Sequence, residues 1–222
     1  WKQLIERMRV NHSELELRYS ANWDHFEIVS FWDLVDVVGL TGYWELTRDP
    51  DASVADLELS WANIIPTLER FQKKLGRRLL ITEIGYPSLR CGACYPWDET
   101  RQAGVDQPAQ LRAYRAFMRA SAKMPMLQGA VWWNWFGFGG PDDTNYTPRK
   151  KPAAALVRQW YQMPHPTAGR TTLQPRPCPR GGLFGARRSC RWMVGGKSVG
   201  RTFLSTAPRL RPWAVSLRAG PR

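Results

Sequence analysis

The segment Leu79-Leu80-Ile81-Thr82-Glu83-Ile84-Gly85-Tyr86-Pro87-Ser88 decides the fold class that we predict for this chain. Three apolar residues lead to one carboxylate, and the turn-forming residues Gly85 and Pro87 follow it. This order is typical of a buried parallel strand that ends at the carboxyl edge of its sheet. A glutamate at that edge is poorly placed for packing and well placed for chemistry, so we take Glu83 as the first candidate for a catalytic residue.

Apolar periodicity on both sides of this strand predicts alternating strands and helices. Strands are predicted from Leu15 to about residues 20–23, and over 35–43, 78–83 and 127–133. Helices are predicted over 1–10, from Ser53 to Leu75, from Gln107 to about 118, and over 152–161. Ser53 and Asp56 form a capping-box pattern at the start of the second helix, and Gly76 marks its end.

Four alternations of strand and helix predict an α/β fold with a parallel sheet and crossover helices. Every predicted strand ends in polar or aromatic residues: Asn22-Trp23, Tyr43-Trp44, Glu83 and Trp133-Asn134-Trp135. In a (β/α)8 TIM barrel the active site lies at the carboxyl ends of the strands. Four such units make half a barrel. We therefore expect residues 1–161 to be the C-terminal half, strands 5–8 with their helices, of a (β/α)8 barrel.

Charge divides the chain into two parts. The formal net charge is +13, but residues 1–161 hold 20 Lys and Arg together with all 19 acidic residues. Residues 162–222 hold the other 12 basic residues and no acid, are rich in Arg, Pro and Gly, and show no periodicity. We expect a disordered basic tail there. Three interpretations of this tail stay open: an arm that binds nucleic acid or a membrane surface, a natural C-terminus, and a segment translated in a shifted reading frame. Its 11 Arg against 1 Lys favour the shifted reading frame.

The four cysteines do not form a zinc motif. Cys91 and Cys94 make one C-x-x-C in the loop after Glu83, and a zinc site needs a second pair of ligands. Two loop thiols or a local disulfide remain open, and we predict no metal site. No apolar stretch reaches the roughly 18 residues of a transmembrane helix. Because the chain opens inside a helix, the lack of a signal peptide says nothing of export, and localisation stays unknown.

Glycoside hydrolysis is the chemistry that these strand ends suggest. Glu83 would be the nucleophile, and Tyr43 on the adjacent strand could donate a hydrogen bond that orients the carboxylate. Sugar rings pack on the flat faces of indoles, and amide side chains form hydrogen bonds with sugar hydroxyls. The next strand end provides both kinds of group in Trp133, Asn134 and Trp135. Two structural alternatives stay open, namely core packing of the indoles and an ion pair of the glutamate with Arg77 or Arg90.

Five motifs occur in order: Tyr19-Ser20-Ala21-Asn22-Trp23-Asp24, Gly39-Leu40-Thr41-Gly42-Tyr43, Thr82 to Ser88, Trp132-Trp133-Asn134-Trp135, and Tyr146-Thr147-Pro148-Arg149-Lys150-Lys151-Pro152. Over about residues 1–161 they resemble the C-terminal half of clan A (β/α)8 glycoside hydrolases, and are most similar to family 113 β-mannanase-like proteins. The resemblance implies a retaining nucleophile, Glu83, oriented by Tyr43, with Trp133 as the floor beneath the sugar. It also implies substrate contacts by Asn22, Trp23, Asn134 and Trp135, and a β-linked oligo- or polysaccharide such as mannan as the partner, without a cofactor.

The chain departs from that family at one essential group. The family's acid/base glutamate follows an asparagine, and this sequence contains no Asn-Glu dipeptide. A retaining hydrolase needs two carboxyls about 5 Å apart. None of the acids in the predicted rim loops matches the position of the family's acid/base glutamate. These acids are Asp24, Glu45, Asp98 and Glu99.

We therefore expect a fragment that lacks the acid/base half and is inactive alone, so whether the chain is itself an enzyme stays open. A non-catalytic carbohydrate-binding relative and a cationic nucleic-acid-binding protein are the alternatives. The nucleic-acid alternative depends entirely on the basic tail, because any non-specific binding of nucleic acid would be made by that segment. Neither the sugar, nor the linkage, nor endo against exo action follows from the sequence.

Overall fold

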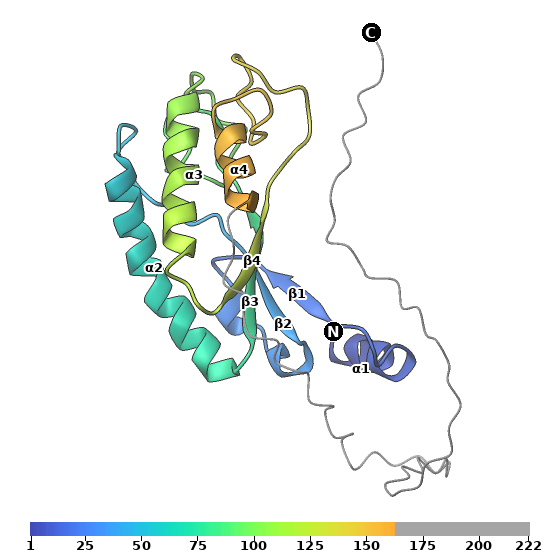
Figure 1. The fold of residues 1–222 in the computed structure, drawn as a ribbon. Helices are drawn as coiled ribbons and strands as arrows, with labels where there is room; N and C mark the ends of the chain where they lie inside the picture. Colours follow the sequence, from blue (N-terminus) through green and yellow to red (C-terminus); the bar gives the residue numbers. More distant parts are fainter. Residues whose placement is uncertain (163–222) are drawn as a thin grey trace, which may run out of the picture. The chain divides into compact units, whose positions relative to one another are not determined.

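The structure is a computed structural model that describes residues 1–162 (Figure 1). The tail is predicted over residues 162–222; Gln162 is the last residue of helix α4 (Ala153–Gln162), and residues 163–222 lie outside the described residues. The principal elements are α1 (Lys2–Asn11), β1 (Arg18–Ala21), β2 (Val37–Thr41), α2 (Val54–Leu75), β3 (Arg78–Ile84), α3 (Gln107–Ser121), β4 (Leu127–Trp132) and α4 (Ala153–Gln162). Two short 3-10 helices, η1 (Phe26–Ile28) and η2 (Trp32–Leu34), lie between β1 and β2.

The four strands form one sheet in the order β1-β2-β3-β4, and each neighbouring pair is parallel. This confirms the predicted α/β fold with a parallel sheet. Because all strands run in the same direction, their carboxyl ends meet at one edge. Ser20, Gly39 and Leu80 are aligned across β1, β2 and β3. The residues that follow β1 to β4 therefore share the edge at which Glu83 lies.

The helices α2, α3 and α4 lie side by side along one face of the sheet (Figure 1). Their apolar sides supply much of the core, including the fully buried Trp61 of α2 and Tyr114 and Phe117 of α3. Trp132 of β4 stacks on Tyr114 with ring centroids 4.3 Å apart and planes 8° apart. Of the two consecutive indoles at the end of β4, Trp132 is therefore the one that packs against the helices.

The predicted boundaries of α2 have clear local causes. The Ser53 hydroxyl accepts a hydrogen bond from the Asp56 amide at 3.2 Å, and the Asp56 carboxylate accepts one from the Ser53 amide at 2.9 Å. The helix ends at Gly76, whose φ of 61° is in the left-handed region that glycine adopts without strain. A membrane-spanning helix is not found among the described residues.

Candidate active site

Glu83 lies near the end of β3, where the ladder between β2 and β3 becomes irregular. The register shifts between Leu40 and Thr41, so that Thr41 is aligned with Glu83. The Gly42 amide then donates to the Glu83 carbonyl at 2.6 Å. As a result β2 ends two residues before the predicted boundary, and the Tyr43 hydroxyl donates to Oε2 of Glu83 at 3.0 Å.

The Tyr43 phenol is held in its protonated form. Burial raises the pKa of Tyr43 far above its ordinary value, and the neighbouring Glu83 carboxylate raises it further. Tyr43 therefore remains a hydrogen-bond donor throughout the physiological range. The two arginines proposed as structural partners are engaged elsewhere, because Arg77 donates to the Asp33 carbonyl and Arg90 pairs with Asp51. Within residues 1–162 no ion pair involves Glu83.

A second phenol, Tyr146, packs behind Tyr43. The two rings meet edge to face with centroids 6.1 Å apart, and the buried Tyr146 hydroxyl donates to the Pro96 carbonyl at 2.6 Å. Burial raises the pKa of Tyr146, with smaller effects from Glu99 and other nearby carboxylates. Tyr146 opens the last of the five sequence motifs, and the sequence alone assigns this residue no role.

The ends of β3 and β4 approach each other at Gly85. A Cβ at this position would overlap the Trp133 carbonyl and press on the Tyr146 ring, so only glycine fits. The Trp133 amide donates to the Ile84 carbonyl at 2.8 Å, and the peptide bond from Trp133 to Asn134 is cis. The Trp133 side chain is 39% exposed, whereas that of Trp132 is buried. Trp133 is thus the indole left accessible beside the end of β3.

The remaining predicted substrate contacts have neighbours other than the Glu83 carboxylate. Asn134 accepts a hydrogen bond from the Phe136 amide at 3.2 Å, and Trp135 is exposed. Asn22 is exposed after β1, where the Trp23 amide donates to the Thr41 hydroxyl at 3.1 Å. None of the contacts within residues 1–162 joins these four side chains to Glu83. The structure therefore brings together Glu83 and Tyr43, with the Trp133 backbone beside them.

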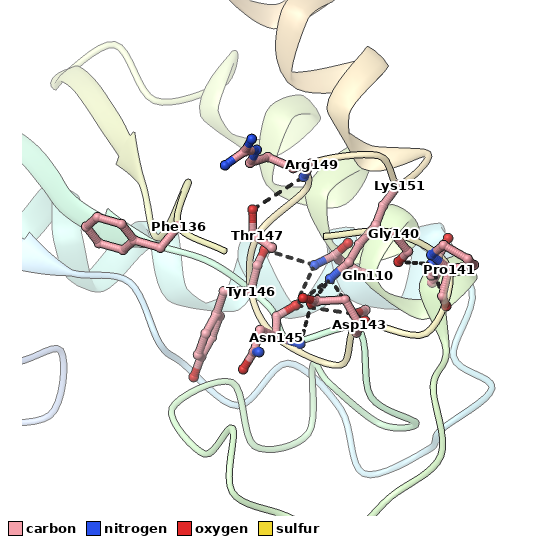
Figure 2. Close-up of polar contacts among 12 residues, drawn as sticks. Gln110, Phe136, Gly140, Pro141, Asp143, Asn145, Tyr146, Thr147, Arg149 and Lys151 are labelled. Carbon is pink, nitrogen blue, oxygen red and sulfur yellow. Dashed lines mark hydrogen bonds and ion pairs between the residues drawn. The ribbon is translucent and has the colours of Figure 1, made fainter. Parts of the chain in front are cut away.

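A buried lysine fixes the loop that carries Tyr146 (Figure 2). The Lys151 side chain is 0% exposed, and its ammonium donates to the Ser88 hydroxyl at 2.7 Å, to Oδ1 of Asp143 at 2.7 Å and to the Asn145 carbonyl at 2.8 Å. Burial lowers the pKa of Lys151, and the Asp143 carboxylate opposes this effect. The cluster ties the loop after β4 to the turn that follows β3.

Gln110 of α3 adds a second connection to the same loop. Its side-chain amide is fully buried and donates to the Tyr86 carbonyl at 2.9 Å. The same amide donates to the Tyr146 carbonyl at 3.0 Å (Figure 2). The Tyr114 hydroxyl also donates to the Tyr146 carbonyl, at 3.2 Å. The backbone of Tyr146 is therefore held from α3 while its ring lies against Tyr43.

Cys91 and Cys94 form a disulfide, which is the local pairing left open by the sequence. Across residues 1–162 the structure shows no group of three His, Cys, Asp or Glu side chains that could hold a metal ion. The chemistry available at the site is that of the Glu83 carboxylate, the Tyr43 phenol that binds it and the accessible indole of Trp133.

Comparison with known proteins points to one family. Residues 1–144 match Glycoside Hydrolase Family 113. The fold is similar to that of a family 113 β-mannanase from Alicyclobacillus acidocaldarius, whose structure is described in complex with ManMIm, at 26% identity and a TM-score of 0.61. That match covers 72% of this chain and 49% of the mannanase.

Two other solved structures share the fold. A family 113 β-1,4-mannanase has 22% identity and a TM-score of 0.62, with 73% of this chain and 50% of that chain covered. A β-glucuronidase from Ruminococcus gnavus has 15% identity and a TM-score of 0.51, over 72% of this chain and 28% of that one. A search of curated proteins found no significant match. This chain spans about half the length of the mannanases it resembles. The match over residues 1–144, well beyond half of the sequence, shows that the chain belongs to Glycoside Hydrolase Family 113.

Proposed function

We propose that this chain supplies the nucleophile of a retaining β-glycosidase of the β-mannanase kind, and that Glu83 is that nucleophile. The observation that carries the proposal is the carboxylate of Glu83 at the carboxyl end of a parallel strand, hydrogen-bonded to Tyr43 at 3.0 Å. An accessible indole, Trp133, follows the next strand. Two of the similar structures are named β-mannanases, so a β-linked mannan is the substrate class that we propose.

The same proposal includes the half-barrel. Residues 1–161 would form strands 5–8 of a (β/α)8 barrel, and the basic segment 162–222 would be a separate region. Three helices cover one face of the sheet, whereas Val131 on the other face of β4 is exposed. Within residues 1–162 the outer edges of β1 and β4 have no strand partner. A closed barrel would pair both edges and cover that face.

In a retaining reaction the Glu83 carboxylate attacks the anomeric carbon, and the bond from this carbon to the leaving oxygen breaks. Tyr43 donates to one carboxylate oxygen, which fixes the orientation of the attacking group. Tyr43 is fixed in turn by the Tyr146 ring behind it. The flat face of Trp133 would pack against the sugar. The leaving oxygen needs a proton from a second carboxyl, and water later releases the sugar from Glu83.

Three of the four acids in the rim loops are engaged with close neighbours, and the fourth, Glu99, is exposed. Asp24 lies 2.7 Å from Nδ1 of His25, and Glu45 pairs with Arg48 at 2.8 Å. Asp98 accepts from the hydroxyl and the amide of Thr100. Loss of general acid catalysis typically lowers a rate by about 10²–10⁴-fold. We therefore propose that the 222-residue chain alone does not hydrolyse β-mannan.

A substrate with an activated leaving group tests the nucleophile separately. 2,4-Dinitrophenolate departs as an anion without a proton, so 2,4-dinitrophenyl β-mannoside can react at Glu83 when no acid is present. We expect the purified chain to release up to one equivalent of dinitrophenolate and to carry one mannosyl ester on the peptide that contains Glu83. The Glu83→Gln variant should show neither product.

The outcomes separate the parts of this proposal. Hydrolysis of β-mannan by the 222-residue chain, lost in Glu83→Gln, would refute the proposed inactivity while supporting the nucleophile. Binding of mannooligosaccharide without any ester on Glu83 would refute the nucleophile and favour a non-catalytic carbohydrate-binding relative. The nucleic-acid alternative depends on residues 162–222, so deletion of that segment should abolish any salt-dependent DNA binding.

A further inference from the structure

The loop between β3 and α3 is held together by several of its own contacts. Leu89 and Val105 form an antiparallel bridge at its base, and the Cys91–Cys94 disulfide follows. Arg101 donates to the Cys91 carbonyl at 3.1 Å, and its guanidinium lies 4.5 Å from the centre of the Tyr95 ring. This loop therefore presents its side chains from a braced backbone.

Its aromatic side chains form a ledge, defined here as Trp23, Tyr95 and Trp97. Trp97 stacks on Trp23 with ring centroids 5.4 Å apart and planes 24° apart, and Tyr95 meets Trp97 edge to face at 5.9 Å. Tyr95 and Trp97 are each 45% exposed. Behind the ledge, the ring of Trp44 packs between two other indoles. Its centroid lies 6.4 Å from that of Trp23 and 5.6 Å from that of the buried Trp61. The ledge is thus an accessible, rigid apolar surface anchored in the core.

Two connections tie this ledge to the candidate nucleophile. Pro96, next to Trp97, accepts the hydrogen bond of Tyr146, whose ring lies against Tyr43. On the other side, the Trp23 amide donates to Thr41, and Thr41 is aligned with Glu83 in the sheet. The ledge and Glu83 therefore belong to the same carboxyl edge of the sheet.

We propose that the ledge binds one pyranose ring of a β-linked glycan, in a subsite beside the sugar that is cleaved at Glu83. A pyranose presents C–H groups on its flat faces, and these pack on indole as apolar surface does. Three acids lie next to the ledge in the chain, Asp24, Asp98 and Glu99, and they outnumber the one cation placed on it within residues 1–162, Arg101. This excess of negative charge disfavours a polyanion such as nucleic acid, and carboxylates accept hydrogen bonds from neutral hydroxyls. The subsite rests on the proposed function for its substrate class.

Fluorine NMR of the full 222-residue chain labelled with 5-fluorotryptophan tests the ledge. Single Trp→Phe variants assign the signals of Trp23, Trp97, Trp133 and the exposed Trp1, which serves as the control. On titration with β-1,4-mannohexaose we expect saturable shifts of the Trp23 and Trp97 signals and none of the Trp1 signal. Shifts confined to Trp133 would overturn the ledge and leave the proposed function standing.

Affinity measured by calorimetry provides the second arm. Trp97→Ala should weaken mannohexaose binding about tenfold, equivalent to about 1.4 kcal/mol. Trp97→Tyr, which keeps an aromatic face, should stay within about threefold of the unmodified chain, and Trp1→Ala within about twofold. An unchanged affinity in Trp97→Ala, or the absence of any saturable shift at the ledge, would refute the subsite. Shifts at the ledge without an ester on Glu83 would support the subsite and refute the nucleophile.

Discussion

Replacing Lys151 by Met removes a buried charge while keeping a side chain of similar length. The ammonium of Lys151 is 0% exposed and donates to Ser88, Asp143 and Asn145. In Lys151→Met the Asp143 carboxylate, which is 17% exposed, loses its cationic partner. The Asn145 carbonyl loses a donor at the same time.

The expected cost follows from these contacts. Removing one partner of a buried ion pair typically costs about 3–5 kcal/mol, because the other charge remains without compensation. Asp143 keeps a hydrogen bond from the Asn145 amide at 2.9 Å and retains some contact with solvent, so the low end applies. We expect the free energy of unfolding to fall by about 3 kcal/mol, a large part of the 5–15 kcal/mol of a typical domain.

Urea unfolding, followed by circular dichroism and tryptophan fluorescence, measures this loss. The control is Lys150→Met, since Lys150 is the exposed neighbour of Lys151 and should change stability by less than about 0.5 kcal/mol. The double variant Lys151→Met/Asp143→Asn removes both charges and should recover part of the loss. A loss below about 1 kcal/mol in Lys151→Met, or no recovery in the double variant, would contradict the reasoning.

Three further predictions concern single contacts. Ser53→Ala removes the capping box that Ser53 forms with Asp56 and should lower the free energy of unfolding by about 1 kcal/mol in the same urea assay. Tyr43→Phe removes a hydrogen bond to the Glu83 carboxylate, worth about 1.5–3 kcal/mol, and should slow the dinitrophenolate burst at least tenfold without unfolding the chain. Burial raises the pKa of both Tyr43 and Tyr146, so their contribution to stability is fully present below pH 10. Above that pH the unfolded phenols ionise first, and stability should fall by up to about 1.4 kcal/mol per pH unit for each tyrosine, with a shallower fall in Tyr43→Phe.

The predictable features of this chain depend on local patterns. The apolar run before Glu83 and the turn residues after it suffice for a buried strand with a carboxylate at its end. Ser53, Asp56 and Gly76 mark the ends of α2 because capping and the left-handed conformation are properties of a few neighbouring residues. The parallel sheet followed from the alternation of such segments.

The unpredicted features depend on contacts between distant segments. Arg149, Lys150 and Lys151 are three consecutive basic residues, and nothing in their order shows which one is buried. Lys151 is buried because the loop after β4 meets Ser88, 63 residues earlier in the sequence. The sequence indicates only a turn at Gly85, whereas the approach of the Trp133 carbonyl requires that this residue lack a side chain.

The surroundings of Glu83 combine these distant contacts into one chemical property. The two arginines considered as ion-pair partners of Glu83 make other contacts, because Arg77 donates to the Asp33 carbonyl and Arg90 pairs with Asp51. The carboxylate instead receives a hydrogen bond from a phenol that burial keeps protonated. A cation in contact with the carboxylate would compete with the anomeric carbon for its electron pairs, whereas a neutral donor at one oxygen leaves the other free to attack. The lack of an ion pair at Glu83 within residues 1–162 is therefore as much a part of the proposed nucleophile as the hydrogen bond from Tyr43.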